Sequence, residues 1–523
     1  MYVMEFRHSG VTRTSRVVRM SLGMFSGSKY RCPVQDSLKA LGYTPVSPPP
    51  GRREVLGQVA LRPLMDELDG RRGPGAPRRH RLDPVLENWT RHALRAYDSA
   101  FFRSDGDSGL SEVARPWTYR YPAGADDHRG ATEYGITVWG RCLASADGTV
   151  RELRLPVHRS GAHNVPADGY VAVAALVTAE DRQSGPPDHV RVVRFPAAGT
   201  RPELLFAGTP EEAKDLHRTH GRHAVRALLD SAEYRPGSAC GSCPFTAGCP
   251  ALMRAPGLTG LSGKGRPRRT WSPTDGREYA ACARRSRARS LRLPTLDAVE
   301  RSPAAERGRA VHAYLAARHR ADPPVPCSSD IPEDWVPAGF ALEERELLIA
   351  TAQLRRHAAV CPLHRVLSAE DVRVEPTVTM EDPAARVVVV TDPDLVYRDG
   401  GSWVWREVKS TSRRFTGTSN LMETYPQLAL AVLMAGEAVW PGRSGNVRVE
   451  AEILRPHGAS LVTLDPSSPA VRDRARKALA PLMAAWHADD SFEPQPGPEC
   501  AACPVSQWCP DAAVRTGAER HEP

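Results

Sequence analysis

The sequence of 523 residues lacks long hydrophobic runs. Hydrophobic residues make up 41 % and charged residues 25 %, and no stretch of about 18 uncharged apolar residues, the length of a membrane span, occurs. The first twenty residues have neither the apolar core nor the small-residue cleavage site of a secretory signal. We therefore expect a soluble, cytoplasmic protein with no membrane contact, whose eleven cysteines serve something other than disulfides.

The sequence also lacks a complete phosphate-binding loop. The nearest pattern, residues 260–265, misses the first glycine at the required spacing and has Gly265 where Ser or Thr should hold Mg2+. We reject an ATP site, so a helicase or a defence-system subunit that works with this protein would be a separate chain. A Gly-x-Ser-x-Gly element for nucleophilic catalysis is absent as well.

The positive charge is modest. Lys and Arg number 70 against 61 Asp and Glu, and this formal net charge of +9 favours a polyanionic partner without proving one. Nine of the basic residues lie between residues 264 and 289, a stretch that would either contact phosphates or form a solvated linker. At roughly 150 residues per domain, the length allows two to four domains.

The cysteines reveal a duplication. Cys240, Cys243 and Cys249 share the pattern Cys-x2-Cys-Pro-x4-Cys-Pro with a second triplet, and lone cysteines precede both triplets at similar distances. The second triplet is Cys500, Cys503 and Cys509, and the lone cysteines are Cys32, 208 residues before Cys240, and Cys282, 218 residues before Cys500. Three thiolates leave a tetrahedral site one ligand short, so we expect each lone cysteine to complete a four-cysteine site.

The spacing leaves two identities open for these sites. Structural zinc is the commoner use of a Cys-x2-Cys triplet, whereas a lone cysteine more than 200 residues upstream is unusual for a zinc ribbon. An iron-sulfur cluster is the other reading. Cys142, Cys327 and Cys361 fall outside both sets, and we expect them to be buried or incidental thiols.

A hairpin in the second half carries candidate chemistry. The apolar strand 387–390 precedes Asp394, an Asp-Gly-Gly turn reverses the chain at 399–401, and residues 403–409 return as a strand. Residues two apart share a face of a strand, so Glu407 and Lys409 should project together toward Asp394. Two carboxylates can hold Mg2+ or Mn2+, and an adjacent ammonium can activate water. A solvated edge hairpin is the alternative.

Further residues favour the metal-binding interpretation over the solvated edge hairpin. In chain order the second half has Cys282, then His312 on a helix, then Asp394, then Glu407-Val408-Lys409, then Tyr425-Pro426-Gln427 at the start of an Ala-rich helix, and then the second Cys triplet. In this combination residues 270–515 resemble the PD-(D/E)XK nuclease superfamily, and more narrowly its RecB-like and AddB-like branch with a 4Fe-4S cluster.

The resemblance implies a role for each motif. His312, Asp394 and Glu407 would be metal ligands, Lys409 the catalytic lysine, and Gln427 with Tyr425 contacts to DNA or to that lysine. Cys282, Cys500, Cys503 and Cys509 would hold a structural 4Fe-4S cluster. One departure is Ala431, where the family usually has a Tyr one helical turn after the Gln.

The first half looks like a degenerate copy. Aligned on the triplets, Arg151-Glu152-Leu153-Arg154 falls on residues 406–409, Tyr170 on Tyr425, Ala172 on Gln427, and Cys142 on Asp394. An Arg in place of the lysine cannot readily give up a proton, and the loss of a carboxylate weakens metal binding. We expect an inactive domain that keeps a second cluster, or zinc, on its four cysteines and either binds nucleic acid or serves as a scaffold.

Together these observations predict an α/β protein of two tandem restriction-endonuclease-like domains, each a mixed sheet flanked by helices and closed by a four-cysteine cluster. The expected boundaries are a disordered arm at 1–20, the degenerate domain at 21–255, a basic linker at 256–270, the nuclease domain at 271–515 and a disordered tail at 516–523. The expected function is metal-dependent hydrolysis of single-stranded DNA or DNA ends in repair, recombination or defence. A non-catalytic nucleic-acid-binding scaffold with structural metal sites is the alternative.

Overall fold

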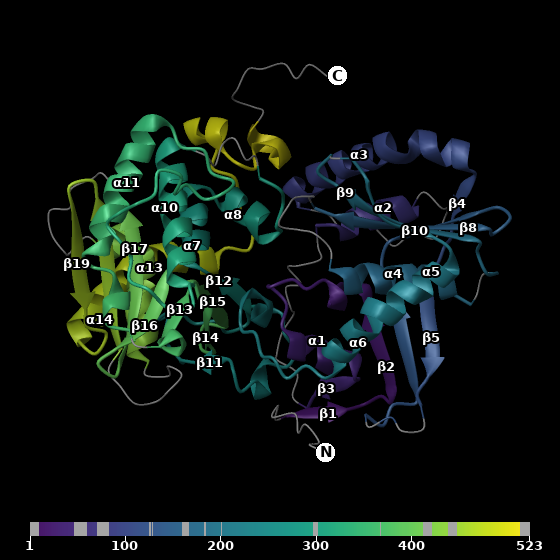
Figure 1. Ribbon diagram of the computed structural model, residues 1–523, viewed down its shortest axis with the longest axis horizontal. Helices are drawn as coiled ribbons and strands as arrows, with labels where there is room; N and C mark the ends of the chain where they lie inside the picture. The colour runs from purple at the N-terminus through teal and green to yellow at the C-terminus, as the bar shows by residue number, and fades with distance from the viewer. Residues whose placement is uncertain are drawn as a thin grey trace. The chain divides into compact units, whose positions relative to one another are not determined.

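The computed structural model describes residues 10–46, 60–70, 83–124, 127, 129–158, 167–182, 185–199, 201–295, 302–366, 368–411, 421–437 and 447–512. The chain forms two compact units (Figure 1). Unit 1 comprises Met1–Ala251, Arg287–Pro294 and Val505–Pro523, and unit 2 comprises Leu252–Ser286 and Thr295–Pro504. Both contain mixed sheets and helices, which confirms the α/β class. Among the described residues, no helix is both long and apolar enough to cross a bilayer.

Unit 1 is built on a five-stranded sheet. Its strand order is β10 (Glu203–Gly208), β9 (His189–Pro196), β8 (Val150–Val157), β7 (Arg141–Ser145) and β4 (Leu110–Glu112). The pair β8 and β9 is parallel and the other pairs are antiparallel. A parallel pair needs a crossover, and α4 (Asp168–Glu180) supplies it with residues 172–179 all buried.

The remaining elements of unit 1 surround this sheet. The strands are β1 (Val11–Arg13), β2 (Val17–Ser21), β3 (Tyr43–Pro45), β5 (Thr118–Pro122) and β6 (Glu133–Thr137). The helices are α1 (Pro33–Ala40), α2 (Arg62–Gly70), α3 (Pro84–Ser108), α5 (Pro210–Leu216), the π-helical turn η2 (His217–Gly221) and α6 (Arg222–Leu229). Strand β2 pairs with β6, and Val18 and Met20 are buried. The expected disordered arm at 1–20 is therefore wrong from Val11 onward, and residues 1–9 lie outside the described residues.

Unit 2 repeats the sheet plan. Its five-stranded sheet has the order β13 (Val372–Val374), β16 (Leu395–Asp399), β17 (Ser402–Ser410), β18 (Val447–Arg455) and β19 (Gly458–Leu464). Again one central pair, β17 and β18, is parallel and the others are antiparallel. A second sheet has the order β11 (Met253–Arg254), β14 (Val378–Asp382), β15 (Val387–Thr391) and β12 (Arg269–Trp271).

The helices of unit 2 cover two apolar clusters. They are α7 (Pro273–Ala281), α10 (Pro303–His319), α11 (Glu344–Ala358), α12 (Leu421–Thr424), α13 (Pro426–Gly436) and α14 (Pro469–Ala488), and α8 (Ala283–Ser290) follows α7. The apolar helix α13 lies in the larger cluster with Trp405 and Val449. The smaller cluster joins α10 and α11 to Val408 and Leu454 of the sheet, and so anchors α10 beside β17.

The segment expected to be a basic linker is packed. The Asp382 carboxylate accepts hydrogen bonds from the backbone N–H groups of Gly257 and Thr259, each at 2.9 Å. Strand β12 then begins at Arg269 and pairs in parallel with β15. Because its backbone is bound in this way, residues 256–270 belong to unit 2 and are not a solvated linker.

The C-terminal segment groups with unit 1 rather than with unit 2. Trp508 packs edge-on against Trp89 with ring centroids 4.9 Å apart, and its indole N–H donates to the Pro294 carbonyl at 2.6 Å. The Asn88 amide donates to the Trp508 carbonyl at 3.3 Å. The expected boundary at 515 is thus replaced by a change of unit at residue 505. The expected tail at 516–523 lies outside the described residues.

Candidate active site

The hairpin of β16 and β17 gathers three of the predicted site residues. Asp394 immediately precedes β16, and its Oδ2 accepts a hydrogen bond from the Val408 backbone N–H at 2.7 Å. The Lys409 ammonium donates to Glu407 Oε2 at 2.9 Å and lies 3.6 Å from Asp394 Oδ2. Val408, between the two, points into the smaller apolar cluster. The alternation of a strand therefore puts two carboxylates and an ammonium on one face.

Helix α10 brings a fourth predicted residue to this group. His312 Nδ1 lies 2.8 Å from Asp394 Oδ1. The Trp405 indole N–H donates to Glu407 Oε1 at 3.0 Å, so this carboxylate is held from two sides. Glu407 is only 2 % exposed. The four side chains form one hydrogen-bonded and ion-paired cluster at the edge between α10 and the hairpin.

The electrostatics of the cluster follow from close packing of opposite charges. Burial raises the pKa of Glu407, and the neighbouring Asp394 carboxylate adds to this effect. Burial opposes charge on Asp394, His312 and Lys409, yet the attraction between the carboxylates and the two cations outweighs this effect. The pKa of Asp394 is therefore lowered, and the pKa values of His312 and Lys409 are raised. Lys409 is thus an ammonium that neutralises two acids.

Gln427 and Tyr425 sit at the start of α13, and a residue not singled out from the sequence connects this helix to the cluster. The Gln427 side-chain oxygen accepts a hydrogen bond from Arg277 at 2.9 Å, and Arg277 also donates to the Thr424 carbonyl at 3.2 Å. Tyr425 precedes α13 and packs on the larger apolar cluster. The exposed Arg277 guanidinium repels the Lys409 ammonium and offsets a small part of the rise in the pKa of Lys409. Arg277 was counted only as one of nine clustered cations.

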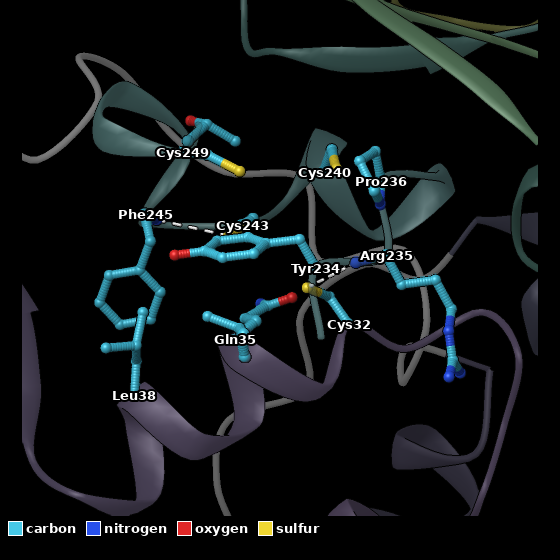
Figure 2. A pocket seen from close by; sticks show the side chains of 12 residues that line it. Cys32, Gln35, Leu38, Tyr234, Arg235, Pro236, Cys240, Cys243, Phe245 and Cys249 are labelled. Atoms are coloured by element: carbon cyan, nitrogen blue, oxygen red, sulfur yellow. Dashed lines mark hydrogen bonds between the residues drawn. The ribbon is translucent and has the colours of Figure 1, made fainter. Parts of the chain in front are cut away.

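The first cysteine set lines one pocket. Cys32 precedes α1, and Cys240, Cys243 and Cys249 come from the turns that follow α6, yet all four surround the same small pocket (Figure 2). Backbone N–H groups of Arg235 and Gly237 donate to Cys32 Sγ and Cys240 Sγ, each at 3.4 Å. Burial raises the pKa of Cys240 to about 12 and that of Cys243 to about 11. Because thiolates are the ligands, metal or cluster binding here would displace protons.

The second cysteine set repeats part of this pattern. Backbone N–H groups of Gln495 and Gly497 donate to Cys282 Sγ and Cys500 Sγ, each at 3.4 Å. These donors precede their triplet by the same intervals as Arg235 and Gly237 precede theirs. Cys282, Cys500 and Cys503 belong to unit 2, whereas Cys509 lies in the segment that groups with unit 1.

The hairpin of β7 and β8 in unit 1 has no equivalent acid cluster. Cys142, expected in the place of Asp394, lies inside β7 and pairs with Leu153, and Gly140 is the residue that immediately precedes β7. A Cβ atom at Gly140 would meet the Arg154 carbonyl oxygen at 2.6 Å. Even the smallest side chain would force the backbone to move, so this site does not accommodate an aspartate.

The cluster of unit 2 lies inside a region that is similar to a known protein family. Residues 270–510 match the family model of the PD-(D/E)XK nuclease superfamily. The matched region contains His312, Asp394, Glu407 and Lys409, and it indicates a metal-dependent nuclease that acts on nucleic acid. No curated protein matches the sequence.

Proposed function

We propose that the protein is a DNA nuclease of the RecB-like and AddB-like branch, which hydrolyses phosphodiester bonds in single-stranded DNA or at DNA ends through the cluster of unit 2. The observation that carries the proposal is the convergence of His312, Asp394, Glu407 and Lys409, since Lys409 Nζ lies within 3.6 Å of both carboxylates and His312 within 2.8 Å of one. The position of this cluster inside the family match supports it further.

The donor set fits a hard divalent ion. Asp394 and Glu407 offer carboxylate oxygens and His312 a ring nitrogen, and two neighbouring acids are stable only beside positive charge. Mg2+ or Mn2+ held there would supply positive charge to the scissile phosphate and lower the pKa of a bound water. Trp405 and the Val408 N–H hold the two carboxylates in place for this task.

Lys409 has the role of a fixed cation. Its pKa is raised by Glu407 and Asp394 against the effect of burial, so it stays protonated at neutral pH. An ammonium in this position donates a hydrogen bond that orients the attacking water and stabilises negative charge that develops on the phosphate. Arg277, exposed and bonded to Gln427, would bind an adjacent phosphate of the DNA strand.

We also propose that the two cysteine sets hold structural 4Fe-4S clusters, with zinc as the alternative. The donor chemistry of the first set fits a cluster, because four cysteines from distant segments surround one pocket and backbone N–H groups point at two of the sulfurs. The parallel N–H donors to Cys282 and Cys500 support the same use in the second set, which Cys503 and Cys509 would complete.

Unit 1 would then be an inactive copy that binds nucleic acid. Its described residues include a cavity of about 480 Å³ lined by Tyr119, Tyr121 and Tyr134 together with cations of η2 and α6. Tyr121 and Tyr134 stack with ring centroids 5.2 Å apart. Aromatic rings beside arginines suit the bases and phosphates of a single strand. The shared sheet order of the two units supports the copy, and the absence of an acid at Gly140 supports its inactivity.

The test is cleavage of labelled single- and double-stranded DNA by the full chain with Mg2+ or Mn2+. Lys409→Ala should reduce cleavage by at least about a thousandfold while DNA binding persists, because the substitution removes charge stabilisation and not the binding surface. Lys477→Ala, at an exposed position of α14, is the matched control and should cleave normally. Undiminished cleavage by Lys409→Ala would refute the site. A wild-type chain that cleaves no DNA or RNA with Mn2+ would favour the scaffold alternative.

A further inference from the structure

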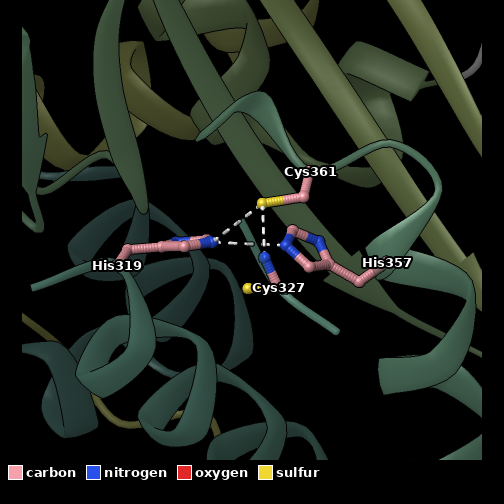
Figure 3. A group of neighbouring side chains, drawn as sticks. All are labelled: His319, Cys327, His357 and Cys361. Carbon is pink, nitrogen blue, oxygen red and sulfur yellow. Dashed lines mark hydrogen bonds between the residues drawn. The ribbon is translucent and has the colours of Figure 1, made fainter. Parts of the chain in front are cut away.

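Four side chains that belong to neither cysteine set gather in the interior of unit 2. They are His319 at the end of α10, Cys327 in the following loop, His357 near the end of α11, and Cys361 just after it. One ligand atom of each lies within 4.8 Å of the ligand atoms of the other three (Figure 3). His319 Nε2 and His357 Nε2 are 3.2 Å apart, and Cys361 Sγ is 3.9 Å from His319 Nε2.

All four residues are buried among apolar side chains. His357 is 0 % exposed, Cys361 3 %, His319 5 % and Cys327 7 %. The cysteines are part of the smaller apolar cluster of α10 and α11. Two imidazoles and two thiols in such a place lose their water contacts, and a shared bound ion is the usual compensation for polar side chains converging on one point.

The surroundings orient one imidazole for metal binding. His357 Nδ1 lies 2.6 Å from Glu452 Oε1 of β18, and Glu452 is itself fully buried. Arg406 donates to the other oxygen of Glu452 at 3.1 Å, so this carboxylate is held on both sides. With its Nδ1 proton donated to Glu452, His357 can offer Nε2, which lies 3.2 Å from His319 Nε2, to a metal ion. A carboxylate behind a histidine in this way is the arrangement that supports zinc ligands.

We propose that His319, Cys327, His357 and Cys361 bind a structural zinc ion. With Zn–N bonds of about 2.0 Å and Zn–S bonds of about 2.3 Å, tetrahedral ligands lie about 3.3 Å (N to N) and about 3.6 Å (N to S) apart, close to the observed separations. Two nitrogens and two sulfurs select zinc over Mg2+ or Mn2+, which prefer oxygen. Four protein ligands leave no open position, so the ion has no catalytic role.

The site is placed to hold the nuclease cluster in position. His319 lies two helical turns after His312 on α10, and both line a small pocket with Asp394. On the other side, the chain of contacts from His357 through Glu452 reaches Arg406, the neighbour of Glu407 on β17. Zinc would therefore fix the end of α10 against the sheet. This consequence for cleavage rests on the proposed function, whereas zinc binding itself does not.

Metal analysis of the full chain, purified without chelators under reducing conditions, tests the proposal. Cys361→Ser should lower the zinc content by one equivalent per chain relative to wild type. The matched control is Cys142→Ser, a buried cysteine of unit 1 outside all these sites, which should keep the wild-type content. Cys240→Ser and Cys500→Ser should also keep this equivalent, because their sites are separate. A wild-type chain without zinc that takes none up, or an unchanged zinc content in Cys361→Ser, would overturn the proposal.

A second measurement does not depend on the stability of Cys361→Ser. Zinc-free protein titrated with Co2+ should develop the strong visible absorption of tetrahedral cobalt and a thiolate-to-cobalt band. Cys361→His, which keeps four ligands, should bind cobalt with a shifted spectrum that reports one thiolate fewer. An identical spectrum in wild type and Cys361→His would contradict the assignment. Normal zinc binding together with absent cleavage would contradict the proposed function and leave the zinc site intact.

Discussion

Strand β17 of unit 2 and strand β8 of unit 1 occupy the same place in two sheets of the same order, yet their polar residues do opposite things. In unit 2, Glu407 and Lys409 face Asp394 and His312, and Lys409 is 16 % exposed, within reach of a substrate. In unit 1, Glu152 accepts from Arg154 at 2.6 Å and pairs with Arg191 at 2.7 Å. Both partners belong to unit 1 itself, and so the carboxylate has a structural use.

Arg154 is held in the interior of unit 1, so a single substitution there would not produce the acid cluster of unit 2. Its guanidinium lies 3.8 Å from the centroid of the Phe101 ring and donates to the Tyr97 hydroxyl at 3.0 Å. A cation stacked and bonded in this way is held in the core. The Gly140 backbone leaves no room for an acid before β7. The same strand order thus supports a partly exposed acid cluster in unit 2 and an ion-pair network in unit 1.

The largest difference between the units should appear in cleavage. Glu407→Gln keeps the shape of the side chain but removes a carboxylate from the cluster, and we expect the rate of DNA cleavage to fall by at least about a thousandfold. Glu152→Gln, a change of the same kind on β8 of unit 1, should leave the rate within about twofold. Quantitative cleavage assays with Mn2+, normalised to folded protein, decide the comparison. Equal losses in both variants would mean that the two units share the catalytic work.

The next effect concerns the buried ion pairs that differ between the units. Arg406 donates to Glu450 at 2.6 Å and to Glu452 at 3.1 Å, so Arg406→Leu removes a cation from two buried acids, of which Glu450 keeps Arg448 at 2.9 Å. We expect the free energy of unfolding of unit 2 to fall by about 3–5 kcal/mol. Arg154→Leu should cost unit 1 less, because it removes a cation from one acid only, Glu152, which keeps Arg191. Hydrogen exchange of β17 and β8 peptides measures the two units separately, and a larger loss of protection in β8 would contradict this ranking.

The sequence predicted the parts of the site that are close along the chain. The Asp-Gly-Gly turn and the period-two alternation placed Asp394, Glu407 and Lys409 together because a hairpin is a local structure. His312 was placed only by resemblance, since its contact with Asp394 depends on how α10 packs on the sheet. The same limit hid Arg277, whose bond to Gln427 joins residues 150 positions apart.

Other features depend on contacts between distant parts of the chain. His357 and Cys361 are four residues apart at the end of a helix, a short-range pair of ligands visible in the sequence, whereas His319 and Cys327 join them only through folding. The sequence could not predict the tight packing at Gly140, because the closeness of this residue to the Arg154 carbonyl arises only from strand pairing. The apolar run 387–390 was correctly predicted as a strand, yet β15 pairs with β14 and β12 rather than with the hairpin of β16 and β17.

A smaller difference between the units concerns the stability that each loses at acidic pH. Burial lowers the pKa of His158 and of His217, both in unit 1, from an ordinary value near 6.5 to about 4. The unfolded chain therefore binds more protons than the folded one between pH 6.5 and 4, so stability is complete above this window and falls as the pH drops through it. We expect unit 1 to lose about 2–3 kcal/mol through His158 by pH 4, and less through His217, because its partial exposure lets solvent screen the charge.

Hydrogen exchange of unit 1 peptides at pH 7 and pH 5 measures this loss. His217→Gln should flatten the pH dependence, because a neutral amide replaces the group that takes up the proton. A pH dependence as steep in His217→Gln as in the wild type would contradict the assignment to this residue.

The smallest effect concerns DNA binding by unit 1. Arg222 and Arg226 are exposed, lie one helical turn apart on α6 and line the tyrosine-bearing cavity. If the cavity binds a single strand, the double variant Arg222→Ala/Arg226→Ala should weaken binding of single-stranded DNA several-fold and reduce the salt dependence of affinity by about two ions. Arg62→Ala, an exposed arginine of α2 outside the cavity, is the control. Binding titrations at several salt concentrations measure both quantities, and an unchanged salt dependence would leave unit 1 a scaffold that shares a fold with the nuclease unit without sharing its substrate.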